Sequence, residues 1–255
     1  MSIEKLFDIK GRKALVTGAG RGIGKVLALT LAEAGCDVAL FGLHHKNLEE
    51  VAALVKKSGV RSLVLEGDVS RKSDVQKAFS VVKKEFGYLD ICVNNAGISL
   101  QTPVEEMPEA DWDRIMDINM KGVFLCSQEA AHLMIPRKSG SIINIGSISA
   151  RVVNVPQKQA IYNTSKAGVV MLTQTMAVEW APYGIRVNSI SPGYMKTEMV
   201  LSSMSKLFPV WESLTPLGRL GEPEELRGAL IYLASGASSY TTGHDLVVDG
   251  GYTVR

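Results

Sequence analysis

Two side chains that could exchange a proton with a ligand lie one helical turn apart in the second half of the chain. Tyr162 and Lys166 open a stretch whose apolar pattern predicts a helix over 162–184. Residues four apart project from the same helix face. A nearby ammonium favours phenolate, so it would lower a phenol pKa that is otherwise about 10. Such pairs also occur by chance, so the prediction depends on what else the chain places beside them.

A glycine-rich turn near the N-terminus could bind a ligand on which this pair of side chains acts. The segment TGAGRGIG (17–24) lies between a predicted buried strand at 13–18 and a predicted helix at 22–35. Its glycines fall at Gly18, Gly22 and Gly24, which departs from the commoner G-x-G-x-x-G spacing. After a strand, such a turn brings the N–H groups of a helix N-terminus to a phosphate. A tight strand–helix connection is the simpler alternative, but the position favours a dinucleotide site.

The elements that must position these residues alternate along the chain as short apolar strands and longer amphipathic helices. Further strands are predicted at 37–42, 61–69, 89–97, 141–147, 185–193 and 245–251, and further helices at 46–59, 73–87, 109–135 and 223–236. Strands that are apolar throughout are buried on both faces. Right-handed crossovers then predict an α/β fold, a doubly wound, Rossmann-like parallel sheet of about seven strands. We expect one domain over 1–255, with a substrate lid at about 193–222.

The composition and net charge of the chain reduce the number of possible partners and functions. Hydrophobic residues make up 46% of the 255 residues and the net charge is +2, so we expect neither disorder nor a nucleic acid or membrane partner. The N-terminus lacks an apolar signal core, which predicts a soluble, cytoplasmic protein. Three widely separated cysteines, Cys36, Cys92 and Cys126, lie in apolar runs. They predict buried thiols rather than a metal site.

The end of the second strand bears on the choice between NAD and NADP. In NAD proteins a carboxylate about 20 residues after the glycines binds the ribose hydroxyls. Asp37 has about that separation but precedes its strand, which ends at Gly42 and continues with Leu43, His44, His45 and Lys46. The absence of an acid and the nearby basic groups predict a preference for NADP. The same basic residues could equally form a solvated helix start.

Four motifs in order carry a family resemblance. TGAGRGIG (17–24), NNAG (94–97), a serine before YNTSK (162–166), and SPGYMKT (191–197) together resemble the single-domain branch of the short-chain dehydrogenase/reductase family. The resemblance covers essentially the whole chain, and the set is far more specific than any single motif. It implies hydride transfer between a nicotinamide and a ketone or secondary alcohol, for which the cofactor supplies the hydride and the protein the proton.

The resemblance also implies a role for each matching residue. The catalytic set would be Asn119, Ser147, Tyr162 and Lys166, with Asn119 kinking a helix and holding a proton-relay water. Asp68 would bond the adenine amine. Tyr162 and Lys166 would also contact the cofactor, together with Gly18, Arg21, Gly22, Ile23, Gly24, His44, Asp68, Val69, Asn94, Asn95, Ala96, Gly97, Pro192, Gly193 and Thr197.

Two serines compete for one role in the implied catalytic set. Ser147 follows N-I-G at the predicted strand end and Ser149 comes two residues later, so in an extended strand both would face the same side. The usual family distance to the tyrosine suits Ser149. We assign Ser147, because G-S ends the strand and the loop that follows looks two residues longer than usual. Ser165 is interpreted as a packing residue.

The substrate is inferred from longer similar stretches. NVPQKQAIYNTSKAGV, WAPYGIRVNSISPGYMKTEM and the ending VVDGGYT look like polyol and sugar-acid reductases such as sorbose reductase, mannitol dehydrogenase and gluconate 5-dehydrogenase. They imply a ketose, polyol or sugar acid as the small-molecule substrate. The loop before Tyr162 carries polar groups that could bind hydroxyls or simply face solvent: Arg151, Asn154, Gln157, Lys158 and Gln159.

Two other functions stay open on the sequence alone. A 3-oxoacyl-carrier-protein reductase shares every catalytic motif and would need a basic patch, for which Arg137, Lys138 and Lys121 are candidates. A non-catalytic NADP(H)-binding sensor would keep the fold without turnover. In this family the helix that carries the tyrosine packs against its twofold mate, which implies a homo-oligomer, a tetramer or a dimer.

Overall fold

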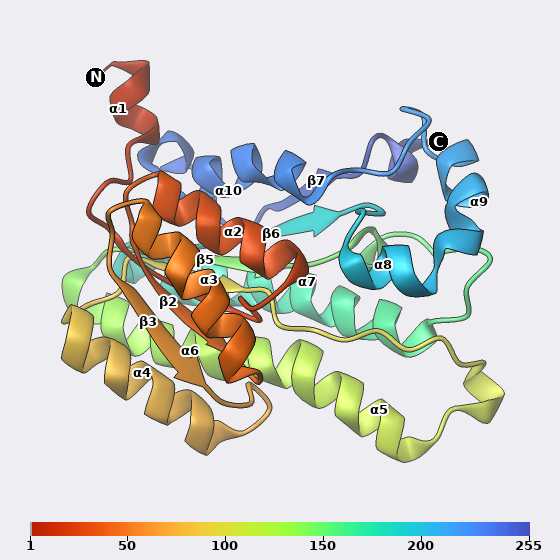
Figure 1. The fold of residues 1–255 in the computed structure, drawn as a ribbon, viewed down its shortest axis with the longest axis horizontal. Coiled ribbons are helices and arrows are strands. Elements are labelled where there is room, and N and C mark those ends of the chain that lie inside the picture. Colours follow the sequence, from red (N-terminus) through yellow and green to blue (C-terminus); the bar gives the residue numbers. More distant parts are fainter. Residues whose placement is uncertain (1) are drawn as a thin grey trace.

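One parallel sheet organises the computed structural model, which describes residues 2–255 apart from the side chains of Met199 and Ser203 (Figure 1). Within those residues the sheet has seven strands in the order β3-β2-β1-β4-β5-β6-β7. The order reverses between β1 and β4, so the predicted doubly wound, Rossmann-like sheet is confirmed. The strand bounds are β1 (Lys13–Thr17), β2 (Asp37–Gly42), β3 (Ser62–Glu66), β4 (Ile91–Asn94), β5 (Gly140–Ile145), β6 (Ile185–Pro192) and β7 (Asp245–Val248).

Helices cover both faces of the sheet, which explains why the strands are apolar throughout. One core lies under α2 (Gly22–Glu33), α3 (His45–Lys57) and α10 (Arg227–Ala234). The other lies under α4 (Lys72–Phe86), α6 (Gly122–Met134) and α7 (Ala160–Trp180). Strand β1 shows the alternation that separates them, because Ala14 and Val16 enter the first core and Leu15 enters the second.

The predicted helix over 109–135 is interrupted in the middle. It begins as α5 (Glu109–Met116), continues through a π-helical turn at Asp117–Lys121, and resumes as α6. Asn119 lies inside this turn and is fully buried. Single π turns within α-helices are frequent at functional sites, because they redirect side chains out of the regular helical register.

The predicted lid contains more regular structure than the sequence indicates. Segment 193–222 holds α8 (Glu198–Ser203) and α9 (Phe208–Ser213). Thr197 caps α8 by accepting a hydrogen bond from the Val200 N–H, and Pro209 lies in the first turn of α9. Helices of six residues are too short to show a helical apolar period. A further short helix, α1 (Ile3–Phe7), was not expected from the sequence either.

The remaining features of the fold concern thiols, metals and membranes. Cys36, Cys92 and Cys126 are free and buried, as predicted, and burial raises the pKa of the Cys36 thiol to about 12. Across residues 2–255, no three metal-binding side chains of the His, Cys, Asp or Glu type are gathered at one place. No helix in the same range has both the length and the apolar character needed to cross a bilayer.

Candidate active site

A cavity of about 400 Å³ lies at the carboxyl edge of the sheet, where doubly wound folds bind their ligands. It is bordered by the ends of β1, β2, β4, β5 and β6 and by α8. Every site residue predicted from the sequence lines it except Asn94 and Asn119, which are buried behind its wall. The structure therefore brings residues from positions 18 to 197 into one continuous space.

The glycine-rich turn forms a cradle at one end of this cavity. Helix α2 begins at Gly22 with no side chain capping its first turn, so its N–H groups, including that of Ile23, are available to an anion. Gly22 has a φ of +53°, a conformation that favours glycine. A Cβ on Gly24 would overlap the carbonyl oxygen of Gly18. These features fit a pyrophosphate, because only bare backbone can approach so closely.

NNAG holds the cradle against the sheet. Asn95 donates from Nδ2 to the carbonyl oxygens of Thr17 and Gly18, at 3.0 and 3.3 Å. The N–H groups of Asn95 and Ala96 both donate to Oγ1 of Thr17, at 2.9 and 3.0 Å. Asn94, one residue earlier, points the other way and bonds Asn144 of β5. Asn95 therefore supports the glycine turn, whereas Asn94 ties the central strands together.

The residues predicted for the adenine end lie beyond β3. Oδ1 of Asp68 accepts hydrogen bonds from the N–H and the hydroxyl of Ser70, at 2.9 and 2.7 Å. Val69 packs against the start of α6, where a Cβ on Gly122 would lie 2.8 Å from its Cγ2. The carboxylate of Asp68 is thus held in one orientation at the cavity wall.

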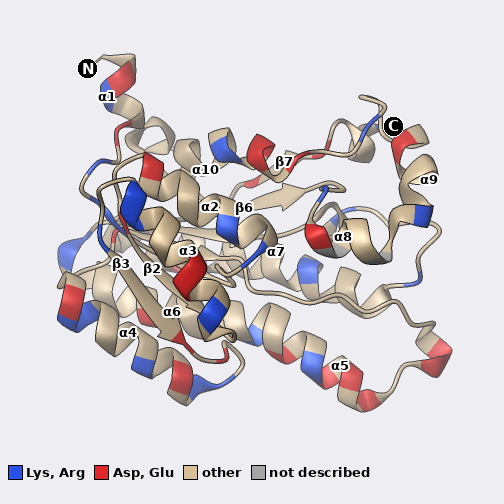
Figure 2. Ribbon diagram, viewed as in Figure 1, with Lys and Arg blue, Asp and Glu red and all other residues tan. Residues whose placement is uncertain are grey.

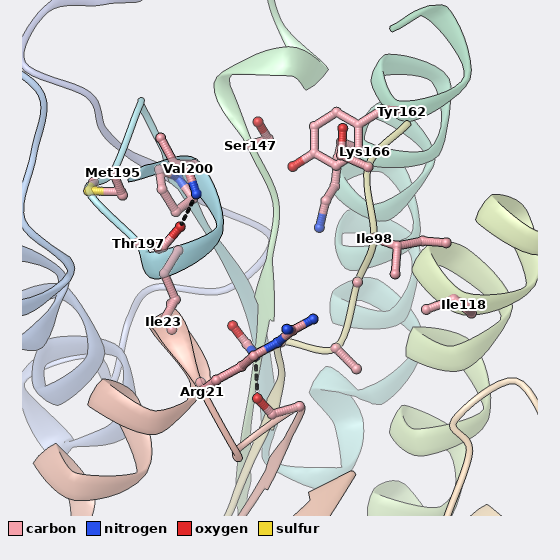
Figure 3. Close-up of a pocket in the computed structure, with 18 of the residues that line it drawn as sticks. Arg21, Ile23, Ile98, Ile118, Ser147, Tyr162, Lys166, Met195, Thr197 and Val200 are labelled. Carbon is pink, nitrogen blue, oxygen red and sulfur yellow. Dashed lines mark hydrogen bonds between the residues drawn. The ribbon is translucent and has the colours of Figure 1, made fainter. Parts of the chain in front are cut away.

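The end of β2 differs from the sequence expectation in one respect. His44 and Asn47 line the cavity there, and Arg21 extends from the glycine turn into it (Figure 3). A carboxylate does lie beside the strand end, because Glu66 of β3 pairs in register with Gly42. Its Oε2, however, lies 3.5 Å from Nδ1 of His45, and Glu66 is not part of the cavity lining. The sequence could not show this acid, because sheet pairing places it there.

Helix α7 presents Tyr162 and Lys166 to the cavity from one face, and Ser147 faces the Tyr162 phenol from the end of β5 (Figure 3). Nζ of Lys166 lies 5.7 Å from the centroid of the Tyr162 ring and donates to the carbonyl oxygen of Ile145 at 2.7 Å. Lys166 is only 5% exposed. This hydrogen bond fixes the helix over the end of the strand.

Burial dominates the protonation of both groups. It raises the pKa of Tyr162, and the facing Ser147 hydroxyl only partly counteracts this increase. It lowers the pKa of Lys166 to about 8. The expectation that the ammonium would lower the phenol pKa is wrong for this structure, because burial outweighs it, although Nζ lies over the Tyr162 ring at 5.7 Å from the centroid. Both side chains are therefore pushed toward their neutral forms.

The two candidate serines have different surroundings. Strand β5 ends at Ile145, and Ser147 caps a 3₁₀ turn at Ile148–Ala150 by accepting a hydrogen bond from the Ser149 N–H at 3.1 Å. The assumption that both serines follow one extended strand is therefore wrong. Oγ of Ser149 bonds Oδ1 of Asn154 at 2.6 Å and is part of the loop structure. These contacts favour Ser147 as the hydroxyl beside Tyr162.

Asn119 is linked to the tyrosine helix through a residue whose role the sequence did not reveal. Its Oδ1 accepts from the Ile98 N–H at 2.8 Å, and its Nδ2 donates to the Ile98 carbonyl at 2.9 Å and to Ser165 Oγ at 3.0 Å. Ser165 in turn donates to the carbonyl oxygen of Tyr162 at 2.8 Å. Ser165 is thus a bridge between the π turn and α7. Its signal in the sequence, a small polar residue beside Lys166, is too common to be informative.

The segment after β6 closes the cavity. Pro192 ends the strand, and a Cβ on Gly193 would lie 2.7 Å from the Cα of Asp249, so the backbone passes close to the C-terminal turn. Thr197 begins α8 and its Cγ2 would be 3.8 Å from a Cβ on Gly22. The start of the lid therefore lies next to the cradle (Figure 3).

Comparison with known proteins agrees with this geometry. A family sequence model described as enoyl-(acyl carrier protein) reductase matches residues 18–253. Sorbose reductase of Candida albicans is 42% identical, over 97% of this chain and 89% of that protein. A probable NADP-dependent mannitol dehydrogenase of Yarrowia lipolytica is 40% identical, over 98% of this chain and 91% of that protein. The crystal structure of a short-chain type dehydrogenase/reductase from Mycobacterium marinum superposes with a TM-score of 0.97 at 46% identity and full coverage of both chains.

The chain belongs to the short-chain dehydrogenase/reductase family. It is accordingly an oxidoreductase that acts on CH–OH groups with a nicotinamide cofactor. The names of the relatives specify different nicotinamide cofactors. An NAD-dependent glycerol dehydrogenase of Listeria innocua is 38% identical over 99% of this chain and 98% of that protein, beside the NADP-dependent mannitol dehydrogenase above.

The tight glycine cradle leads to a binding prediction. Gly24→Ala should weaken NADPH binding by about tenfold or more, because the added methyl must displace the Gly18 carbonyl and the side chain of Asn95. Titration of NADPH fluorescence measures the affinity. Gly228→Ala is the matched control, since a Cβ on that helical glycine meets nothing within 4 Å. Equal affinity for both variants would contradict the close approach.

The buried lysine leads to a stability prediction. Lys166→Met should stabilise the cofactor-free protein below pH 8, because the folded chain bears a cost on the order of 3 kcal/mol for the buried ammonium. Loss of the hydrogen bond from Lys166 to Ile145 reduces the gain in stability of the variant by about 1 kcal/mol. Between the folded pKa of about 8 and the ordinary value of 10.5, the unfolded chain binds more protons. Wild-type stability therefore rises with pH, and the advantage of the variant shrinks.

Urea unfolding at about pH 7 and about pH 10 measures both effects. Lys158→Met, at a lysine whose side chain is 66% exposed, is the control and should change little at either pH. A difference between Lys166→Met and wild type that stays the same at the two pH values would show that Lys166 is not desolvated.

Proposed function

We propose that this enzyme catalyses the reversible, NADP-linked reduction of a ketose or related keto-sugar to a polyol. One observation carries the proposal: the Tyr162 phenol, the Ser147 hydroxyl and the Lys166 ammonium lie in the same cavity as a backbone cradle that fits a pyrophosphate. The names of the relatives supply the substrate class, since sorbose reductase and mannitol dehydrogenase both act on the ketose–polyol pair.

In the reducing direction Tyr162 serves as the general acid. When bound, NADPH would supply a hydride for the carbonyl carbon, and the Tyr162 phenol would give its proton to the carbonyl oxygen. A raised pKa suits this role, because it keeps Tyr162 protonated until negative charge develops on the substrate oxygen. The Ser147 hydroxyl orients the same oxygen. Oxidation of the alcohol requires the reverse transfer.

Lys166 and Asn119 complete the proposed catalytic set. Lys166 provides positive charge beneath the tyrosine and can bond the cofactor ribose. A Cβ on Gly97 would lie 3.3 Å from Oδ1 of Asn119 and 3.7 Å from Nζ of Lys166, so both groups border the same point of the backbone. Both amide hydrogens of Asn119 are donated to protein groups. One lone pair of its Oδ1 remains for the predicted relay water.

The preference for NADP over NAD is a separate part of the proposal. Arg21 and His44 line the end of the cavity next to β2, and the carboxylate that lines it beyond β3, that of Asp68, already accepts two hydrogen bonds from Ser70. The nearest acid in the sheet, Glu66, faces His45 outside the cavity. A 2′-phosphate would therefore meet donors and positive charge rather than repulsion.

An acyl-carrier substrate is supported less well. Arg137 is bonded to Asp90 and Lys121 to Asp117, each at 3.2 Å, so two of the candidate basic residues already have acidic partners. Figure 2 shows acidic residues around the start of α5, and Glu105 among them lies 4.0 Å from Lys158 of the loop before α7. An acidic carrier would be repelled there.

A homo-oligomer is also proposed. Val178 and Met171 on α7 are 77% and 62% exposed, and Phe124 on α6 is 44% exposed, while Val169 and Met176 are buried in the core. Apolar side chains on neighbouring exposed helix faces are typical of subunit contacts. The cytoplasmic location stays a prediction, in agreement with the free cysteines.

The general-acid role gives the main test. Tyr162→Phe should lower turnover of L-sorbose with NADPH by about 10²- to 10⁴-fold, because the proton donor is lost. NADPH affinity should change little, since the phenyl ring still fills its place. Initial-rate absorbance and NADPH fluorescence measure the two quantities. Tyr183→Phe, at an exposed tyrosine outside the cavity, is the control. Unchanged turnover in Tyr162→Phe would refute the general-acid role, whereas NADPH binding by the wild type without any turnover would support the sensor function instead.

The cofactor preference has its own test. His44→Asp should lower the ratio of kcat/KM for NADPH to that for NADH by about tenfold or more, because the new carboxylate would face the 2′-phosphate. His45→Asp places the same charge one residue further on, outside the cavity, and should have the smaller effect. A wild-type enzyme that prefers NADH would refute the NADP assignment.

A further inference from the structure

The substrate end of the cavity has a polar wall that the proposed chemistry does not use. Asn154 and Gln157 come from the loop after β5, and Tyr194 and Trp211 come from the segment after β6. All four line the cavity. Asn154 and Gln157 are only 3% and 9% exposed, so the loop does not simply face solvent. We call these four residues the amide wall.

Hydrogen bonds and stacking fix the orientation of each side chain in the wall. The indole N–H of Trp211 can only donate, and it lies 3.2 Å from Oε1 of Gln157. The other end of that amide, Nε2, therefore faces the Tyr194 hydroxyl at 2.7 Å. Asn154 Nδ2 donates to the same hydroxyl at 3.0 Å. The rings of Tyr194 and Trp211 stack with centroids 4.0 Å apart and planes within 6°.

A count of donors and acceptors shows what the wall can still bind. Gln157 gives one amide hydrogen to Tyr194 and accepts one bond from Trp211. Among the described residues nothing takes its second hydrogen, and one lone pair of Oε1 stays open. Oδ1 of Asn154 already accepts from Ser149 and Gln159, so Asn154 can offer only a donor. Gln157 thus presents a donor and an acceptor together, which matches an alcohol hydroxyl.

The wall carries no positive charge. Of the basic residues that line the described cavity, Arg21 and His44 belong to its cofactor end, and Lys166 lies on α7 next to Tyr162, where it donates to Ile145, and is not part of the wall. Lys158, next to Gln157 in the chain, is 66% exposed and lies 4.0 Å from Glu105. The other cation of this loop, Arg151, bonds the carboxylate of Asp245 at 2.8 Å.

A carboxylate substituent would find no matching partner on the wall. A carboxylate can only accept hydrogen bonds, and its burial without a cation is costly. Glu198, the acid of α8 that lines the cavity, is exposed and follows Thr197, which lies beside the glycine cradle, so it is not part of the wall. A sugar acid would therefore leave the acceptor of Gln157 unmatched and place its charge against a surface without a cation.

We propose that the amide wall is the specificity surface of this enzyme, and that it selects uncharged ketoses and polyols over sugar acids. The inference rests on the proposed carbonyl reduction and narrows its substrate class. Gln157 binds a substrate hydroxyl, while Asn154, Tyr194 and Trp211 hold its amide in the orientation that makes this possible. Sugar acids are rejected because the wall offers them no counter-charge.

The test compares one neutral and one anionic carbonyl substrate with NADPH. For the wild-type enzyme we expect kcat/KM for L-sorbose to exceed that for 5-keto-D-gluconate by about tenfold or more. Gln157→Leu should lower kcat/KM for sorbose by about tenfold, mainly through KM, with NADPH affinity unchanged. Gln157→Arg should raise the ratio of keto-acid to sorbose turnover by about tenfold or more, because it supplies the missing cation. A merely structural role for Gln157 would not move that ratio.

Lys158→Gln is the matched control, since it changes the neighbouring residue outside the wall. This variant should keep kcat/KM for each of the two substrates within about twofold of the wild-type value. Selective loss of keto-acid turnover in Lys158→Gln would show that Lys158 receives the carboxylate, and would overturn the inference. Wild-type turnover of 5-keto-D-gluconate equal to or above that of sorbose would overturn it too, with the proposed reduction intact. Failure to reduce either carbonyl with NADPH or NADH would instead refute the proposed function.

Discussion

The hydrogen bond from Lys166 to the carbonyl of Ile145 is the contact on which the geometry of the site depends. It joins the last residue of β5 to the middle of α7, and so fixes the tyrosine helix over the edge of the sheet. Ser147 follows Ile145 directly beyond Gly146, and Tyr162 lies one turn before Lys166, so their separation is set by the same contact. The contact also requires a buried ammonium, which a backbone carbonyl and the face of the Tyr162 ring stabilise without a counter-charge among the contacts of Lys166 with the described residues. The site therefore contains a buried charge whose desolvation opposes folding.

Further support for this arrangement comes from the π turn between α5 and α6. Asn119, in the π turn, holds Ile98 and Ser165, and Ser165 holds the backbone of Tyr162. The loop that follows β4 is thus tied to the helix that carries the proposed catalytic pair. Rigid elements position the chemistry, whereas the proposed recognition surface lies on a loop and on short lid helices. This division is common where one fold serves many substrates.

The sequence predicts the sheet and the long helices because their apolar periods are strong. It predicts the cradle because Gly18, Gly22 and Gly24 occur at a strand–helix junction. It does not predict features that depend on contacts between distant segments. Glu66 reaches the end of β2 only through sheet pairing, and the stack of Tyr194 on Trp211 joins the end of β6 to a helix of six residues. The protonation of Tyr162 was mispredicted for the same reason, since burial and the position of Ile145 decide it.

The closeness of the glycine turn to the rest of the fold has a consequence for evolution. At Gly24 an added methyl would meet backbone, so the phosphate cradle tolerates almost no change. The neighbouring end of β2 is different, because Leu43 is 55% exposed and His44 begins a helix at the surface. Substitutions there cost the fold little. If this rim selects the nicotinamide, as proposed, a lineage could exchange one cofactor for the other by substitutions there while the cradle stays unchanged, which agrees with relatives named for either cofactor.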